Sequence, residues 1–205
     1  MTWEPNYLTV PEGRAYLRIQ DGDDDTEIAA VITAASRAID LTCNRQFGIV
    51  AAAEVRYYTA AWDRELDRWI IEIDDLMTTP AVGAITVQDG DGTPLGIIDK
   101  YTLTPRNAAS RSRPWTEIIV KPDAAIQPTG VIDEVAAVAL WGWSTVPVPI
   151  KQACYLQMNR LLARRDSPYG VAGSPDLGSE LRLLARLDPD VAVSVSTYRR
   201  WWGAA

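Results

Sequence analysis

The stretch Leu140–Gly173 decides the fold, and it reads LWGWSTVPVPIKQACYLQMNRLLARRDSPYGVAG. Pro147 and Pro149 hold φ at about −65° and lack a backbone N–H, which suits the first turn of a helix because those groups have no partner there. From Ile150 onward, apolar residues recur at helical spacing on more than one side. Ser167–Gly170 ends the helix. We expect this apolar helix to be the central core element, on which the other helices pack.

Other helices are predicted on both sides of this stretch. The first is short and begins with Thr9 and Glu12, which form a capping-box pattern. A second is predicted over Asp25–Gln46, because its apolar residues recur at steps of three and four. After the central helix, Leu177–Leu187 is amphipathic and predicts a further helix, and a last segment runs over Val191–Trp202.

The middle of the chain predicts a small β region. Asp89–Gly92, which reads DGDG, predicts a hairpin turn because glycine supplies the positive φ that such turns need. Short runs rich in β-branched and aromatic residues lie on both sides of this turn, separated by turn-forming residues. These runs are Glu54–Tyr58, Trp69–Ile73, Ala84–Gln88, Gly96–Leu103, Glu117–Val120 and Val131–Leu140. We interpret the β region as an excursion from a helical core.

The expected fold class is therefore α+β, mainly α. It has a helical bundle as its core and a β-hairpin or small-sheet insertion between the second and third main helices. We expect one domain over residues 1–205, because 205 residues suffice for one large domain or two small ones. Within it, residues 1–50 hold the N-terminal helices, 51–143 the β insertion, and 144–205 the central and C-terminal helices.

The charge is unevenly distributed along the chain. The net charge is −7, with a balance of −10 in the first 149 residues and +3 from Ile150 onward. An acidic body disfavours tight, sequence-independent DNA binding, which depends on neutralising phosphates. The basic C-terminal part suggests a partner with an acidic surface, although a mixed solvated face is the simpler explanation. No apolar run approaches the roughly 20 residues that cross a bilayer, so we expect no membrane partner.

The composition leaves little room for catalysis. The chain has no histidine, which excludes Ser-His-Asp and Cys-His catalysis and the common zinc sites. The two cysteines, Cys43 and Cys154, fall in predicted helices, where small buried apolar side chains are favoured over a disulfide or a metal site. The sequence also lacks a phosphate-binding glycine loop and a nucleophile elbow. We expect no enzyme, no cofactor and no metal.

Eight tryptophans are many for this length, and most are expected in the core or on sheet faces. Trp201 and Trp202 differ, because they follow Tyr198, Arg199 and Arg200 close to the end of the sequence. Tryptophan, tyrosine and arginine are enriched at interface hot spots. These five residues are candidates for a partner interface, and docking back on the protomer's own surface is an equally open alternative.

A family resemblance emerges from motifs spread along the whole chain. They are YLTVPEGRAYLRI with its acidic DGDDD, AAVITAASRAIDLTCNRQFG, VRYYT, AITVQDGDGTPL, DKYTLTPRNA, WGWSTVPVPIKQA, RRDSPYGVAG, and LARLDPDV before YRR. In this order and spacing they resemble the head–tail connector family of tailed bacteriophages, the adaptor or head-completion proteins that lie beneath the portal.

The resemblance implies a structural virion protein of the head–tail neck, assembled in the host cytoplasm. It implies a homo-oligomeric ring, a dodecamer when matched to the portal, that joins head to tail and continues the DNA channel. Its partners would be further copies of itself, the portal, and a stopper or tail protein on the other side. DNA would pass through without sequence-specific binding.

The resemblance also suggests where partners bind. Because the C-terminal part of such proteins engages the portal, the portal-interface candidates are Tyr198, Arg199, Arg200, Trp201 and Trp202. The predicted hairpins give candidates for contacts with a neighbour, namely Trp62, Trp69, Asp89 and Asp91.

Two alternatives to a portal-bound connector stay open. One is a single-stranded nucleic-acid binder that uses strand aromatics as stacking platforms, against which the acidic charge argues. The other is a different neck or tail-end ring protein, a stopper or a tail terminator, against which the helix-rich ends of the chain argue.

Overall fold

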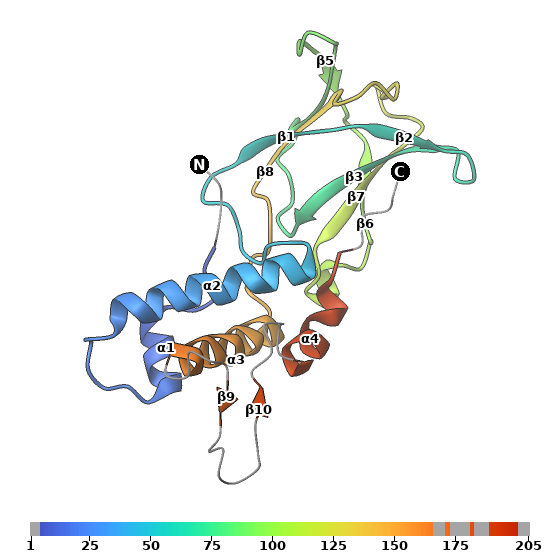
Figure 1. The fold of residues 1–205 in the computed structure, drawn as a ribbon. Helices are drawn as coiled ribbons and strands as arrows, with labels where there is room; N and C mark the ends of the chain where they lie inside the picture. The colour runs from blue at the N-terminus through green and yellow to red at the C-terminus, as the bar shows by residue number, and fades with distance from the viewer. Residues whose placement is uncertain (1–4, 166–170, 173–180, 183–188, 201–205) are drawn as a thin grey trace. The chain divides into compact units, whose positions relative to one another are not determined.

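The computed structural model describes residues 5–165, 171–172, 181–182 and 189–200 of the 205-residue chain. The chain divides into two compact units (Figure 1). Residues 1–47 and 146–205 form a helical unit, and residues 48–145 form a β-rich unit. No helix in the described ranges is long and apolar enough to cross a membrane.

The helical unit contains α1 (Val10–Leu17), α2 (Asp25–Cys43), α3 (Val148–Arg165) and α4 (Pro189–Val195), followed by the 3-10 turn η3 (Ser196–Tyr198). The short strands β9 (Val171–Ala172) and β10 (Leu181–Arg182) pair antiparallel. Helix α3 packs against both α2 and α4.

The helices begin and pack as their sequences predict. Thr9 caps α1, since its Oγ1 accepts the Glu12 N–H at 3.3 Å while the Glu12 carboxylate accepts the Thr9 N–H at 2.7 Å. Helix α2 buries a stripe that includes Ile28, Ile32 and Ile39. Gly13 lets α1 approach this stripe closely, because a Cβ there would lie 3.1 Å from the side chains of Ile28 and Ile32.

The β-rich unit holds two four-stranded antiparallel sheets, with strand orders β1-β8-β4-β5 and β2-β3-β7-β6. Strand β1 ends at Tyr58 and β2 begins at Ala60, so the chain passes from one sheet straight into the other (Figure 1). The strands are β1 (Glu54–Tyr58), β2 (Ala60–Asp63), β3 (Arg68–Leu76), β4 (Ile85–Gln88), β5 (Pro94–Ile97), β6 (Tyr101–Thr104), β7 (Trp115–Val120) and β8 (Val135–Ala139). A single 3-10 turn, η1 (Ala109–Arg111), lies between β6 and β7.

Alternating residues of these strands build a core inside the β-rich unit. Ile71 of β3 pairs with Ile118 of β7, and both are fully buried. Trp141 and Trp143 are buried in the same unit although they precede the central helix. Each indole N–H has a partner there, since Trp141 donates to the Glu54 carbonyl at 2.9 Å and Trp143 to the Asp75 carboxylate at 2.7 Å.

The predicted fold class is wrong in two respects, the share of helix relative to strand and the nature of the core. The structure is 32% helix and 25% strand, with four α-helices and two four-stranded sheets in the described ranges, so the core is not a helical bundle. The physical reason is that the strands bury apolar side chains within residues 48–145, which gives the β-rich unit a core of its own.

The helix predicted over Leu177–Leu187 is also wrong where the structure describes it. Leu181 and Arg182 form β10, whose backbone pairs with Ala172 and Val171 of β9. The rest of that predicted helix lies outside the described residues.

Candidate interaction surfaces

The C-terminal segment is attached to the end of α2 in the helical unit. Val191 and Val195 of α4 are buried, and the Cys43 thiol donates to the Val195 carbonyl at 3.9 Å. Further along, the Arg200 N–H donates to the Cys43 carbonyl at 2.8 Å. The chain is therefore held in place up to residue 200, which is where the predicted portal segment lies.

The structure brings the first three portal candidates together on this attached segment. The Tyr198 ring is half-buried and meets Phe47 edge-on, with ring centroids 5.8 Å apart. Arg199 is exposed and Arg200 is half-buried. Trp201 and Trp202 lie outside the described residues. Tyr198 thus docks partly on its own protomer, and the portal role of the segment stays a prediction.

The β2–β3 hairpin presents aromatic side chains at its end. Trp62 pairs across the hairpin with Trp69, and the two rings meet edge to face with centroids 5.1 Å apart. Trp69 lies against Gly130, where a Cβ would come within 3.4 Å of the ring. The Asp63 carboxylate accepts the N–H groups of Glu65 and Leu66 and so fixes the turn. Trp62 and Leu66 are left 45% and 53% exposed.

The β4–β5 hairpin confirms the turn predicted from the DGDG sequence. Asp89 Oδ1 accepts the N–H of Asp91 at 3.0 Å and that of Thr93 at 2.8 Å, and Gly92 has φ of +82°. Asp89 therefore shapes the turn, whereas Asp91 is exposed. The role of both residues as neighbour contacts stays a prediction.

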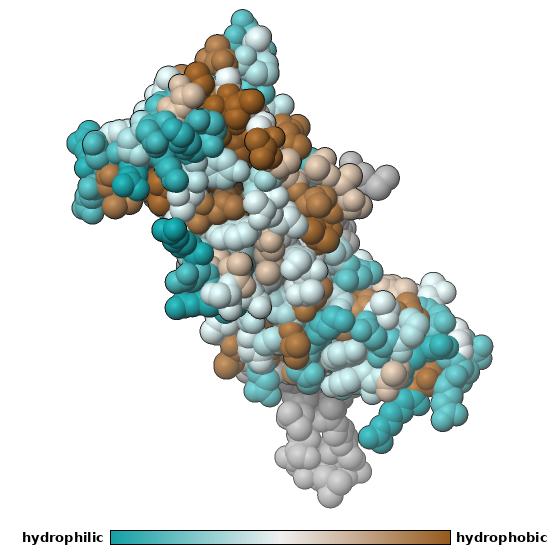
Figure 2. Space-filling view, turned by 180° about the vertical axis from the view of Figure 1, so that it is seen from behind, coloured by the Kyte–Doolittle hydropathy of each residue, from teal (hydrophilic) through white to brown (hydrophobic). Residues whose placement is uncertain are grey.

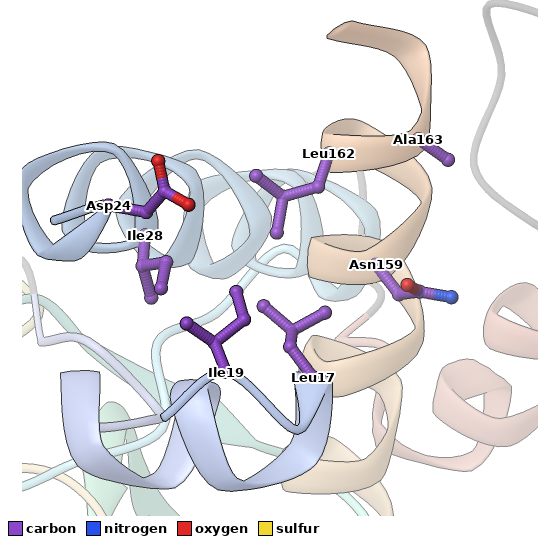
Figure 3. Close-up of a pocket in the computed structure, with 7 residues that line it drawn as sticks. All are labelled: Leu17, Ile19, Asp24, Ile28, Asn159, Leu162 and Ala163. Carbon is purple, nitrogen blue, oxygen red and sulfur yellow. The ribbon is translucent and has the colours of Figure 1, made fainter. Parts of the chain in front are cut away.

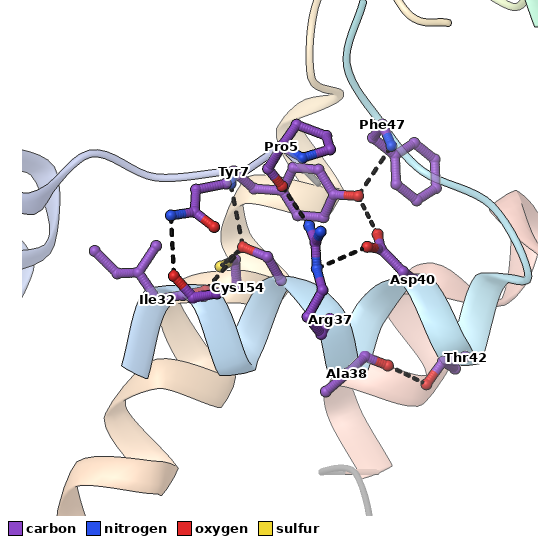
Figure 4. A network of polar contacts seen from close by, with 12 residues as sticks. Pro5, Tyr7, Ile32, Arg37, Ala38, Asp40, Thr42, Phe47 and Cys154 are labelled. Carbon is purple, nitrogen blue, oxygen red and sulfur yellow. Dashed lines mark hydrogen bonds and ion pairs between the residues drawn. The ribbon is translucent and has the colours of Figure 1, made fainter. Parts of the chain in front are cut away.

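A buried polar cluster ties the residues before α1 to α2 (Figure 4). The Tyr7 hydroxyl donates to Asp40 and accepts the Phe47 N–H at 2.9 Å. Arg37 Nε lies 3.1 Å from Asp40 Oδ2, and the same guanidinium donates to the Pro5 carbonyl. Burial, followed by the nearby Asp40 charge and its hydrogen bond, raises the pKa of Tyr7 far above its ordinary value. The phenol therefore stays neutral and serves as a clamp.

A cleft of about 330 Å³ opens between α1, α2 and α3 within the helical unit. Figure 3 shows Leu17, Ile19 and Leu162 converging on it. Asp24 and Asn159 are the polar residues among its described lining. Sequence reasoning did not single out this cleft, because its walls come from three separate helices. Its mostly apolar lining suits an apolar side chain better than a charged ligand.

The two cysteines are buried and chemically quiet. Both side chains are fully buried, and Cys154 Sγ lies 3.7 Å from the Ser36 hydroxyl. Burial raises the pKa of the Cys43 thiol to about 12 and that of Cys154 to about 11. Both therefore remain neutral thiols near neutral pH. Within the described ranges, no three cysteine or acidic side chains are grouped closely enough to hold a metal ion.

Comparisons with known proteins support the resemblance to neck proteins. No family model matches the chain. No curated protein matches it either. Among solved structures, the chain is similar to a chain in the neck of an empty GTA particle, a phage-like gene transfer agent, computed with C6 symmetry. The match has a TM-score of 0.58 and 22% identity, and it covers 100% of this chain and 96% of the other. The resemblance to neck proteins is thus confirmed at the level of the fold.

Proposed function

We propose that this chain is a structural protein of the head–tail neck of a phage-like particle. The observation that carries the proposal is the end-to-end fold similarity to a neck chain, which spans both units. The sequence motifs that resemble head–tail connectors are likewise spread over the whole chain. The proposed role is mechanical and involves no reaction. Its place is the virion, after assembly in the host cytoplasm.

In the proposed assembly, copies of the chain form a ring beneath the portal and continue the DNA channel. The similar neck was computed with C6 symmetry, which is compatible with six or twelve copies in a ring. The net charge of −7 fits a channel through which DNA slides, because such a wall does not grip phosphates. A stopper or tail protein would bind on the side away from the portal.

The C-terminal segment is the proposed portal contact. It is anchored by buried Val191 and Val195 and by the Arg200 N–H, so the residues beyond start from a fixed point. Removing residues 201–205 deletes Trp201 and Trp202 but keeps the Tyr198 contact with Phe47. This truncation is expected to lose portal binding in a pull-down while keeping the full-length unfolding midpoint. Unchanged portal affinity would refute the assignment.

The proposed function is tested by deleting the gene in the cells that produce the particles. We expect DNA-filled heads and separate tails that do not join, counted by electron microscopy. A plasmid copy of the wild-type gene should restore joined particles. Tailed particles at normal yield in the deletion strain would contradict the proposal.

A further inference from the structure

The first sheet of the β-rich unit has an apolar outer face. Tyr57, Ala136, Thr86 and Ile97 form one cross-strand row over β1, β8, β4 and β5, and Val55 pairs with Val138 beside it. Four of these side chains remain half-exposed, namely Val55 (47%), Tyr57 (52%), Ile97 (48%) and Val138 (43%). We call these six residues the apolar sheet face. Figure 2 shows apolar side chains gathering over the β-rich unit on one side of the molecule.

The row has the profile of a shallow trough. Tyr57 and Ile97 stand on the two edge strands, about 14 Å apart at three strand spacings. Between them lie the small side chains of Ala136, which is only 3% exposed, and Thr86. The opposite face of the sheet is covered, as Gly96 shows, because a Cβ there would lie 2.7 Å from the Ile126 side chain. With respect to the described residues, the trough is therefore the more open side of this sheet.

A hollow continues the trough at the end of β8. Its volume is about 400 Å³, and its lining includes Ala53, Val82, Val138 and Leu140. Val138 belongs to both the hollow and the apolar sheet face, and Val82 on the rim is fully exposed. No described lining residue is charged. Together the two features form a contiguous exposed apolar surface, and such surfaces are often interaction sites.

The same chain offers a matching convex element. The β2–β3 hairpin carries Trp62 and Leu66 about half-exposed at its end, and Trp69 braces Trp62 from across the strand pair. A buried tryptophan inserted in a pocket is the usual anchor of a protein interface. The hollow is lined by uncharged residues, and the exposed charged residues at the end of the hairpin, Arg64, Glu65, Asp67 and Arg68, sum to zero. The contact therefore adds no net charge to the repulsion between two chains of charge −7.

We propose that the β2–β3 hairpin of one copy docks on the apolar sheet face of the next copy, with Trp62 entering the hollow beside Val138. The inference rests on the proposed ring, for which it names the contact between subunits. A hairpin and a trough are different surfaces, so the contact is heterologous and repeats around a ring until it closes. Trp62, Leu66 and the apolar sheet face would form the centre of this interface, and a stable interface buries about 800 Å² on each partner.

The test is cysteine cross-linking of the purified full chain. Two single variants, E65C in the turn of the hairpin and V82C on the rim of the hollow, both keep Trp62, and they are mixed and treated with a short bis-maleimide. Cys43 and Cys154 are fully buried and stay unreactive, so each variant has one reactive thiol. The mixture is expected to give a covalent dimer that neither variant gives alone. The double variant E65C/V82C is expected to give a ladder whose largest member is the closed ring.

The control replaces V82C with S110C, which places the thiol on the exposed loop between β6 and β7. No dimer with E65C is expected. The separate variant Trp62→Ala is expected to raise the ratio of monomer to ring at least tenfold in native mass measurements. Its circular dichroism spectrum should stay unchanged.

The outcomes separate this inference from the proposed function. Rings that form without any cross-link between positions 65 and 82 would overturn the docking contact and leave the neck role standing. Equal cross-linking to position 110 would overturn it too. A chain that stays monomeric at every concentration and gives no cross-link would contradict both the docking contact and the proposed ring.

Discussion

At the scale of single residues, two neighbouring tryptophans show how the β-rich unit is held together. Trp141 and Trp143 are equally buried, yet one donates to a backbone carbonyl and the other to the Asp75 carboxylate. Hydrogen bonds to charged groups contribute more than neutral ones, roughly 1.5–3 against 0.5–1.5 kcal/mol. Asp75 is itself only 6% exposed, so its carboxylate depends on donors from the protein.

The first prediction uses this matched pair. Trp143→Phe is expected to lower the free energy of unfolding by about 1–2 kcal/mol more than Trp141→Phe, because it removes a donor from a buried carboxylate. Both substitutions remove the same part of the indole ring. The difference between the two losses in the free energy of unfolding therefore reflects the hydrogen-bond acceptor. Urea unfolding measures both values. Equal losses would contradict the role assigned to Trp143.

The second prediction concerns Tyr7 and pH. Its pKa is raised in the folded chain, mainly by burial and then by Asp40. Above pH 10, the ordinary pKa of tyrosine, the unfolded state therefore releases the phenol proton that the folded state keeps. Stability that is fully present below pH 10 is thus lost as the pH rises beyond it.

We expect the wild-type chain to lose stability more steeply above this pH than Tyr7→Phe does. At neutral pH the variant should be less stable by about 1.5–3 kcal/mol, because it loses the bond to Asp40. Tyr16→Phe is the control, since Tyr16 is 40% exposed and keeps its stacking on Tyr155. Parallel pH profiles for wild type and Tyr7→Phe would refute the clamp.

At the scale of elements, local sequence signals predicted most starts and turns correctly. The capping pair Thr9 and Glu12, the prolines at the start of α3, and the DGDG turn all lie where expected, because each acts through its own backbone. All six predicted strands overlap real ones, although Gly96–Leu103 was predicted as one strand and overlaps both β5 and β6. Strand β2 was missed because AAWD is too short and mixed to show a period. Element bounds follow from local chemistry, whereas strand order depends on distant partners.

The candidate site could be predicted only in part for the same reason. Asp89 and Asp91 were singled out because turn chemistry marks their hairpin, whereas Trp62 and Trp69 were singled out as aromatic residues in or beside predicted strands. The apolar sheet face was not, because Tyr57, Ala136 and Ile97 meet only through pairings between distant strands. The strand VAAVA of β8 was one available signal, since it lacks the polar alternation of a solvated sheet.

The third prediction concerns Gly142, which joins β8 to the segment before α3. It has φ of +108°, and a Cβ there would lie 1.9 Å from the Gly48 carbonyl oxygen. Gly142→Ala is expected to lower the free energy of unfolding by on the order of 3 kcal/mol or more, because the backbone at Gly48 or Gly142 must move. Gly90→Ala is the control, since a Cβ there meets nothing within 4 Å. Similar melting temperatures for the two variants would contradict the close approach.

At the scale of the whole molecule, the chain combines two units with separate cores. Residues 48–145 bury their own sheets and both tryptophans, and the helices enclose a core of their own. Each unit also carries a candidate surface. The helical unit holds the anchored C-terminal segment and the β-rich unit holds the hairpin and the apolar sheet face. The mistaken helical-bundle prediction arose because the apolar central helix was assumed to supply the only core.

The fourth prediction follows from this division. A fragment of residues 48–145 is expected to fold alone, with a cooperative urea transition and blue-shifted tryptophan emission from buried Trp141 and Trp143. The same fragment with Gly142→Ala should lose the cooperative transition. It therefore shows what a collapsed but unfolded fragment looks like in the same measurements. Red-shifted emission without cooperativity in the parent fragment would show that the sheets depend on the helices.

We propose that this chain acts by assembling into a ring of the neck. Native mass measurement of the full chain, alone and mixed with a portal ring, is the decisive test of this assembly. We expect a closed ring whose copy number is a multiple of six, bound to the portal. A chain that stays monomeric in the presence of the portal, or that binds it with no fixed stoichiometry, would refute the proposed assembly.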